Sequence, residues 1–320
     1  MLGEIKKIYC FNNKIYICSN NAIYIFNSQG KFLSVLDKKG IGPNEYIHID
    51  DFQVLDNGNI LILSRSDKKI FEYDGVSNCI NSIELDFWAL NFYADGNNIY
   101  VYLGNEISGE KNYKIVKYNN GSYSNGYIEI DKNKAKYLHI FSTNNFTKHS
   151  GTLYFYESFS DYVYQFENEI FKNKLIINFG SKNIPVDFYS QNFSNIMEFF
   201  KVLKNKDYAY GIQLFTETEN NYFISYLYKQ KTHFSINNKI TNSTNDFVKI
   251  IENTQLYDFP IECDIDKSFI QNNLLMTTID NQLITDYMDS LKNKDAKEVI
   301  SKKISKDAEA NPILVIFSLK

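Results

Sequence analysis

Two predicted loops carry the side chains whose types could form a binding site. Arg65 and Asp67 lie in the first loop, and Glu157 and Asp161 lie in the second. The planar guanidinium of Arg65 is suited to bidentate contacts with a carboxylate or a phosphate. If the two loops meet on one face of the fold, we expect these four residues to line a pocket there. An exposed arginine without a ligand is the alternative.

Two short segments resemble catalytic motifs but lack their context. Gly40-Ile41-Gly42 has the glycine spacing of a phosphate loop, yet Pro43 removes a backbone donor and no Gly-Lys-Ser/Thr follows. Ser66-Asp67-Lys68-Lys69 fits the loose Ser-x-x-Lys pattern without its accompanying motifs. We therefore predict a connector loop and a hairpin loop at these positions, and we predict no catalytic residue.

The metal-binding side chains do not have the spacing of a transition-metal site. The cysteines Cys10, Cys18, Cys79 and Cys263 include no CxxC pair, and the histidines are His48, His139, His149 and His233. Several carboxylates could contribute to a calcium site in a central channel, although Asp is also the residue that turns require. These are Asp50, Asp51, Asp56, Asp95, Asp264 and Asp266. We expect free thiols and no cofactor, with calcium as the open alternative.

The charge of the chain argues against nucleic-acid and membrane partners. The formal net charge is -4, so the chain has no bulk attraction to DNA, RNA or an anionic membrane. No apolar run reaches the roughly 18 residues that a membrane span requires. Met1 to Glu4 leads directly into a strand pattern, without the regions of a signal peptide. The protein is therefore either cytosolic or has lost an export signal by cleavage.

The elements that must position these residues form a repeating unit of four short strands. Tyr and Phe number 25 each among 320 residues, which favours strands. In the first unit, strands are expected at 5–11, 14–18, 22–27 and 31–36, with Asn12-Asn13 as a two-residue turn. That turn places Cys10 opposite Ile15. The second strand of the unit recurs after roughly 40 to 55 residues, as in propeller blades.

We predict a single domain, 1–320, that is an all-β, six-bladed propeller with four-stranded antiparallel blades. The expected blades are 5–36, 52–85, 90–130, 139–179, 208–236 and 259–319. Apolar residues at three- and four-residue spacing predict two short helical insertions, at about 191–203 and 282–304. Blade six is expected to have strands at 259–265, 274–278 and 313–319 and to lack a fourth. Either the chain has lost an upstream segment or the ring closes through packing alone.

Several segments resemble a known family. Ile23-Tyr24-Ile25-Phe26 is followed by the connector Gly40-Ile41-Gly42-Pro43-Asn44-Glu45-Tyr46, then by Asn178-Phe179-Gly180 with Ile184-Pro185, and finally by Asn311-Pro312-Ile313-Leu314-Val315. In this order they resemble the NHL-like six-bladed β-propeller family of Bacteroides-type gut bacteria, a group of unknown function. The resemblance implies a periplasmic or cell-surface location. Cys18-Ser19 stands where an Asp is common in the family, so a ligand role for that Asp does not carry over.

Taken together, the sequence favours a binding or scaffold module over an enzyme. We expect a rigid monomeric ring whose loops engage a protein, a peptide or a glycan on one face. The alternative is a metal-dependent hydrolase resembling lactonases or lyases, with an ion in the central channel. The aromatic side chains are expected in the packing, the lone Trp88 included, although a sugar-stacking platform is a second interpretation.

Overall fold

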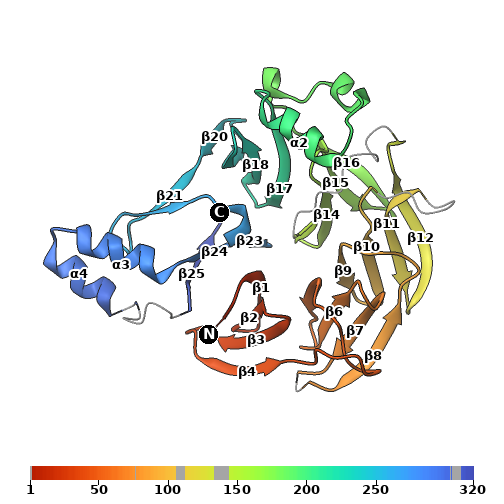
Figure 1. Cartoon of the computed structure of the whole chain (residues 1–320), viewed down its shortest axis with the longest axis horizontal. Helices are drawn as coiled ribbons and strands as arrows, with labels where there is room; N and C mark the ends of the chain where they lie inside the picture. Colours follow the sequence, from red (N-terminus) through yellow and green to blue (C-terminus); the bar gives the residue numbers. More distant parts are fainter. Residues whose placement is uncertain (1, 76, 106–111, 133–143, 303, 305–310) are drawn as a thin grey trace.

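The chain forms a ring of antiparallel β-sheets, as the repeat predicted. The computed structural model describes residues 2–75, 77–105, 112–132, 144–302, 304 and 311–320. In Figure 1 the sheets stand around a central axis, with their first strands innermost and their fourth strands at the rim. Five of these sheets have four strands in chain order, and a sixth has three. The fold is therefore a six-bladed β-propeller.

The first three blades lie within one residue of their expected limits. Blade one contains β1 (Ile5–Phe11), β2 (Lys14–Ser19), β3 (Ala22–Asn27) and β4 (Phe32–Leu36). Blade two contains β5 (Asp51–Val54), β6 (Ile60–Ser64), β7 (Lys69–Tyr73) and β8 (Cys79–Glu84). Blade three contains β9 (Asn91–Asp95), β10 (Asn98–Tyr102), β11 (Tyr113–Asn119) and β12 (Ser122–Glu129).

The remaining blades follow the same plan with longer connections. Blade four contains β13 (Phe146–His149), β14 (Thr152–Tyr156), β15 (Tyr162–Glu167) and β16 (Ile170–Ile176). Blade five contains β17 (Ala209–Glu217), β18 (Asn221–Tyr228), β19 (Lys231–Asn238) and β20 (Thr244–Phe247). Blade six contains β23 (Ser268–Gln271), β24 (Leu274–Ile279) and β25 (Ile313–Ser318). The expected absence of a fourth strand in blade six holds among the described residues.

Two of the later strand predictions were wrong, and one lies outside the described residues. The predicted first strand of blade six falls on β22 (Phe259–Glu262), which instead pairs with β21 (Lys249–Glu252) in a separate hairpin. The inner strand is β23, whose four residues were too few to stand out as a pattern. Blade five extends past residue 236 to include β20. The start of blade four was placed at 139, among residues that are not described, and its first described strand is β13.

Both predicted helical insertions are present. The first contains η1 (Gly180–Lys182), η2 (Val186–Ser190) and α2 (Ile196–Lys204), and the second contains α3 (Asn281–Ser290) and α4 (Lys294–Ser301). A further short helix, η3 (Ile265–Lys267), precedes β23. The Asn195 side chain caps α2 by accepting a hydrogen bond from the backbone N–H of Glu198 at 3.0 Å. In Figure 1 the helices α3 and α4 project from the ring beside β21.

Asparagine turns set the register of the hairpins. Asn12 and Asn13 have φ angles of 47° and 57°, which is the left-handed pair that a tight two-residue turn requires. With this turn Cys10 lies opposite Ile15, as predicted. Because side chains alternate between the faces of a strand, this register decides which residues of blade one face each neighbouring blade.

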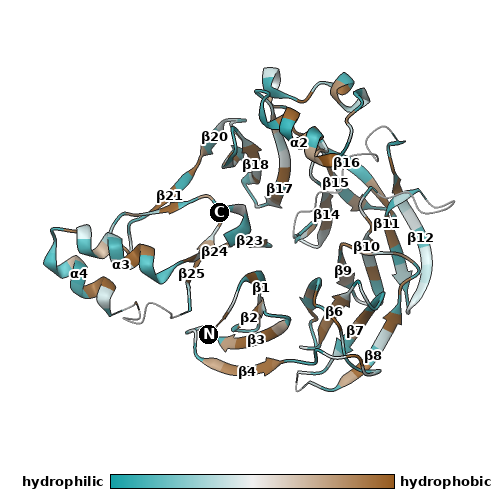
Figure 2. Cartoon of the chain, viewed as in Figure 1, coloured by the Kyte–Doolittle hydropathy of each residue, from teal (hydrophilic) through white to brown (hydrophobic). Residues whose placement is uncertain are grey.

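The core lies between the blades rather than inside any one of them. One buried cluster joins blades one and two through Ile23, Tyr46 and Phe52, and another joins blades six and one through Ile8 and Met276. Figure 2 shows hydrophobic residues distributed along strands all around the ring. Each sheet therefore removes its neighbour's apolar face from water, and the stability is shared around the ring.

Candidate functional site

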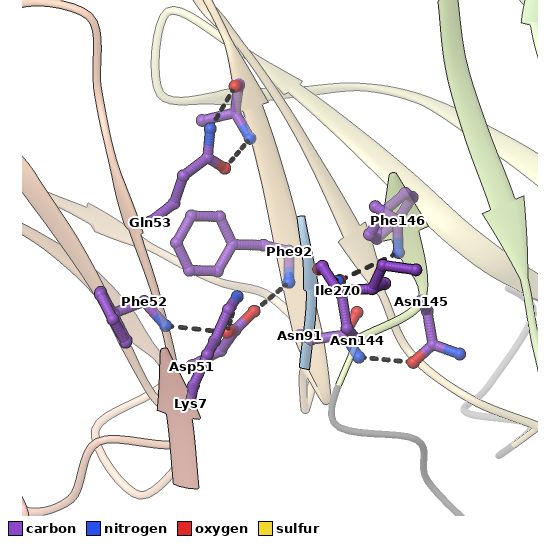
Figure 3. Close-up of polar contacts among 11 residues, drawn as sticks. Lys7, Asp51, Phe52, Gln53, Asn91, Phe92, Asn144, Asn145, Phe146 and Ile270 are labelled. Atoms are coloured by element: carbon purple, nitrogen blue, oxygen red, sulfur yellow. Dashed lines mark hydrogen bonds and ion pairs between the residues drawn. The ribbon is translucent and has the colours of Figure 1, made fainter. Parts of the chain in front are cut away.

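The inner strands carry polar side chains that connect neighbouring blades across the central channel. The Lys7 ammonium on β1 donates to Asp51 Oδ1 on β5 at 2.6 Å, and the backbone N–H of Phe92 on β9 donates to Asp51 Oδ2 at 3.0 Å (Figure 3). One carboxylate thus joins three blades. Burial raises the pKa of Asp51, while the Lys7 ammonium and two backbone N–H groups act in the opposite direction. Asp51 is held by protein partners on both of its oxygens.

A set of asparagines continues this belt on the other side of the channel. The Asn91 amide donates to Asn145 Oδ1 at 2.5 Å, and the Asn145 amide donates to the carbonyl of Tyr156 at 2.7 Å. The Asn144 amide donates to the carbonyl of Ile270 at 3.2 Å, which joins blade four to blade six (Figure 3). Because blade five lies between blades four and six in the ring, this contact spans the inner edge of blade five.

Two glutamines make the same two-point contact at different joints of the ring. Gln53 donates to the carbonyl of Ala94 and accepts from its N–H, both at 2.8 Å, which joins blades two and three. Gln271 accepts from the N–H of Cys10 at 2.7 Å and donates to its carbonyl at 3.0 Å. The second pair joins blade six to blade one, so the ring closes by side-chain contacts. In both cases a primary amide takes the place of a backbone partner.

Beyond this belt the channel widens into a cavity of about 290 Å³. Its lining comes from the inner strands of blades one, two, three, four and six, and it includes Tyr9, Asp56, Tyr93, Thr147 and Lys148. It lies toward the turns that join the first and second strands, because its lining extends to Asp56, Asp95 and Asn272 at those turns. Belt residues such as Lys7, Gln53 and Asn144 also line this cavity, which we call the cup.

The lining of the cup includes the uncharged polar side chains of Tyr9 and Thr147. Burial raises the pKa of Tyr9 to about 12, with a smaller contribution from the Asp56 charge, so its hydroxyl remains a donor. The hydroxyl of Thr147 is buried and has no hydrogen-bond partner within the described part of the chain. Tyr93 packs against Phe146 with ring centroids 6.3 Å apart. Such a combination of rings, hydroxyls and carboxylates suits a small polar ligand.

Arg65 lies on the opposite face of the ring and is engaged by its own protein. Its guanidinium donates to Asp50 Oδ1 from Nε at 2.8 Å and from Nη2 at 2.6 Å. The guanidinium carbon also lies 5.9 Å from the ring centroid of Trp88. Trp88 is 58% exposed, so the expectation that it lies in the core was wrong. Asp50 fixes the arginine, and the arginine in turn supports an exposed indole.

Asp67 stabilises the glycine-containing connector. Its Oδ2 accepts from the backbone N–H of Ile47 at 2.9 Å and from the hydroxyl of Ser64 at 2.5 Å. In the same connector, Glu45 Oε2 accepts from the N–H of Gly42 at 2.9 Å. The Glu45 carboxylate therefore caps this loop from within the chain, which supports the connector interpretation.

Glu157 and Asp161 share a loop but differ in environment. Glu157 is buried, forms an ion pair with Lys114 and accepts from the hydroxyl of Tyr102 at 3.0 Å. Asp161 is exposed, and its backbone carbonyl accepts from the N–H of Ile177 at 2.7 Å. Three of the four residues from which a pocket was predicted, namely Arg65, Asp67 and Glu157, contact partners within the protein. The pocket formed by these residues and Asp161 stays a prediction.

The carboxylates considered for calcium are dispersed. Asp95 pairs with Lys148 at 2.8 Å, and Asp264 Oδ1 accepts from the N–H of Asp266 at 3.0 Å. Asp56 is exposed at the rim of the cup. Across the described residues, no group of three or more His, Cys, Asp or Glu side chains could hold a metal ion. Calcium binding stays untested.

The four cysteines are free thiols. Cys18 and Ser19, which stand where the family commonly has an Asp, are both buried. Burial raises the pKa of the Cys18 thiol to about 12. The thiol is therefore protonated at neutral pH and is not a nucleophile.

Sequence reasoning missed the belt and the cup. Lys7, Gln53 and Asn91 lie on strands that were predicted from their apolar residues, and Asp51 was considered only as a candidate calcium ligand. The available signal was a polar residue at every second position of an otherwise apolar inner strand, as in Asp51-Phe52-Gln53-Val54. Asn144 and Asn145 follow the segment that was taken for the first strand of blade four.

The fold and the belt define a six-bladed β-propeller with a cup at one mouth of its channel. The chain belongs to the family described as Domain of unknown function (DUF4934), which matches residues 1–318. No curated protein matches the sequence. None of the described helices has both the length and the apolar character needed to cross a membrane.

Solved structures share the ring. A protein from Bacteroides fragilis that is described as a putative exported protein is similar over 100% of this chain and 92% of its own, with a TM-score of 0.76 and 19% identity. A member of the DUF4221 family from Bacteroides vulgatus is similar over 88% of each chain, with a TM-score of 0.56 and 12% identity. Virginiamycin B lyase from Staphylococcus aureus covers 84% of this chain and 89% of its own at a TM-score of 0.46 and 11% identity. The first two likenesses show that this chain shares their fold.

Proposed function

We propose that this protein is a non-enzymatic binding module whose cup at the channel mouth takes the end of a neutral polar chain, a glycan in preference to a peptide. The observation that carries the proposal is the cup itself, whose lining includes Tyr9, Tyr93 and a buried Thr147 hydroxyl without a partner among the described residues. An orphan buried hydroxyl costs free energy unless a ligand or water satisfies it.

The chemistry of the lining favours a sugar. Tyr9 and Tyr93 offer aromatic rings with hydroxyls that stay protonated, and Asp56 offers an acceptor without an ion pair among the described residues. Sugars present apolar C–H faces and many hydroxyl donors, which aromatic rings and carboxylates bind well. A peptide carboxylate would find no isolated positive charge at Lys7, because Asp51 neutralises it.

The test is calorimetric titration with a panel of neutral di- and trisaccharides. We expect one or more to bind, and we expect Thr147→Val and Tyr9→Phe each to weaken that binding roughly 3- to 10-fold, the effect of one lost hydrogen bond. Tyr123→Phe, on the outer strand β12, is the matched control and should leave affinity unchanged. Binding that is insensitive to both cup variants would refute the site.

The hydrolase alternative is decided in the same assay. If the protein, incubated with calcium and the same saccharides or with simple lactones, releases products catalytically, then it is an enzyme and the binding-module proposal fails. We expect the added compounds to be recovered unchanged.

A second binding surface is favoured by one observation, the exposure of Trp88 beside Arg65. We propose that this loop face engages a protein or peptide partner through the exposed indole of Trp88, which Arg65, held by Asp50, supports. Arginine and tryptophan are the residues most enriched at the energetic centres of interfaces. Loss of partner capture in Trp88→Ala, with saccharide binding retained, would separate this surface from the cup.

We further propose a location outside the cytoplasm, in the periplasm or at the cell surface. The similarity to an exported Bacteroides protein supports this location. Fractionation of cells that produce the full-length native protein tests it.

A further inference from the structure

The wall of the cup is incomplete on the side of blade five. The described residues that line the cup come from blades one, two, three, four and six, and none of them lies on β17, the inner strand of blade five. At this place the Asn144 amide, directly before β13, donates to the carbonyl of Ile270 on β23 at 3.2 Å. Blades four and six thus contact each other past the inner edge of blade five, which stands back from the channel.

A second cavity, of about 740 Å³, lies over blade five. Its lining comes from the turns that join the first and second strands of three consecutive blades. Blade four contributes residues 149–151, blade five contributes 218–220 and blade six contributes 272–273. The cup lies toward the same kind of turn, so both cavities are on one face of the ring. The volume is within the range of sites that bind small molecules.

The two cavities share part of their lining. Lys148 on β13 and Asn272 in the turn after β23 belong to both. Lys148 forms an ion pair with Asp95 at 2.8 Å, so its charge is compensated where the cavities meet. The hydroxyl of Thr216 on β17 donates to the carbonyl of Asn272, which holds the turn of blade six beside blade five. The cup and the second cavity therefore form one groove, which leaves the channel mouth over blade five.

The chemistry of the groove changes along its length. The aromatic rings of Tyr9 and Tyr93 lie in the cup, whereas the described lining of the second cavity includes no tyrosine, phenylalanine or tryptophan. That lining offers instead the exposed side chains of Glu219, Asn220 and Asn273. An amide both donates and accepts hydrogen bonds, and a carboxylate accepts them. Stacking is therefore available at the channel mouth, and hydrogen bonds to hydroxyl groups are available beyond it.

We propose that this groove binds a linear neutral oligosaccharide, whose end lies in the cup and whose following units leave over the turn of blade five. The inference rests on the proposed function of the cup and adds to it the length and the direction of the ligand. The path is set by blade five, because the other five blades contribute to the wall of the cup. A disaccharide occupies the cup alone, and a longer chain also contacts Glu219 and Asn220.

The dependence of affinity on chain length tests the path. Malto-, cello- and manno-oligosaccharides of two to six units serve as probes in calorimetric titrations. In the series that binds, we expect the hexasaccharide to bind about tenfold or more tightly than the disaccharide, the effect of two added hydrogen bonds. Equal affinity from two to six units would overturn this inference and leave the cup as the site. Absence of binding in all three series would count against the cup itself.

Variants of the protein locate the added contacts. The double variant Glu219→Ala/Asn220→Ala should weaken hexasaccharide binding about tenfold and leave disaccharide binding unchanged, whereas Tyr9→Phe should weaken both. Asn97→Ala is the matched control, because Asn97 is exposed in the equivalent turn of blade three and lines neither cavity. Circular dichroism confirms the fold of each variant. A double variant that binds the hexasaccharide as tightly as the unaltered protein, or that weakens both lengths equally, would contradict the path over blade five.

Discussion

Glu157 and Asp161 lie in the same loop, but one is buried in a joint between blades and the other is exposed. Glu157 is buried against the ammonium of Lys114 and the hydroxyl of Tyr102, between blades three and four. Asp161 faces solvent. Removing one member of a buried pair leaves an uncompensated charge in a medium of low dielectric constant. The first residue therefore contributes to the joint between blades, whereas the second contributes little to folding.

Neutralising Glu157 is expected to destabilise the ring. We predict that Glu157→Gln lowers the free energy of unfolding by about 3 to 5 kcal/mol, because Lys114 is left buried without its counter-charge. Asp161→Asn should change it by less than about 0.5 kcal/mol. Urea unfolding followed by circular dichroism measures both. A Glu157→Gln protein of unchanged stability that has lost partner binding would instead support the ligand role expected from the sequence.

Packing within the connector between blades one and two explains its Gly40-x-Gly42-x-x-Glu45-Tyr46 motif. A Cβ on Gly40 would lie 1.9 Å from Glu45 Oε2, so no side chain fits there while the carboxylate caps the loop. Tyr46 is buried, donates to the carbonyl of Asn21 at 3.0 Å and packs edge-on against Tyr73. The glycine, the glutamate and the tyrosine thus fold one loop together.

Changing the first glycine of the connector should loosen it. We predict that Gly40→Ala costs about 1 to 3 kcal/mol of stability and increases cleavage within residues 38–46 by a nonspecific protease, because Glu45 must leave its position. Gly42→Ala should have a smaller effect, since its Cβ would lie 3.1 Å from the same oxygen. Limited proteolysis with mass spectrometry gives the cleavage sites. An effect of Gly42→Ala larger than that of Gly40→Ala would contradict this account.

The strands of the blades could be predicted from the sequence, whereas the residues of the candidate site could not. Turn residues and alternating strands located blades one to three because every hairpin there is short and its turn chemistry is local. Blade six was misassigned because Phe259 to Glu262 is a good strand that pairs outside the ring. The partners of Lys7, Asn91 and Asn144 lie on other blades, and contacts between blades depend on the closed ring rather than on nearby sequence. The cup could not be derived before the ring was known.

Buried tyrosines define the behaviour of the whole molecule at high pH. Burial raises the pKa of Tyr9, Tyr118, Tyr164 and Tyr226 to about 12 each, from an ordinary value of 10.0. These rings lie in blades one, three, four and five. Ionisation is therefore disfavoured in the folded ring at several of its joints.

Stability should fall as the pH rises above 10. The unfolded chain loses tyrosine protons from pH 10 upward, whereas the folded chain holds them until about pH 12, so the stabilisation present below pH 10 is lost between these values. We predict a falling urea midpoint from pH 10 to 12 and a delayed rise in phenolate absorbance at 295 nm in the folded protein. Tyr9→Phe should remove one tyrosine from the delayed group. A midpoint independent of pH up to 11 would contradict the prediction.

The contacts made by Gln53 and Gln271 determine where the chain can be opened without loss of the fold. Gln271 holds the seam between β23 and β1 with the same amide-to-backbone bonds that Gln53 uses in an uninterrupted part of the ring. The seam is therefore chemically equivalent to a joint that the chain crosses covalently. A circularly permuted gene that fuses the present ends and opens the chain between blades two and three would keep both glutamine contacts, so the cyclic order of the blades, rather than their linear order, specifies this architecture.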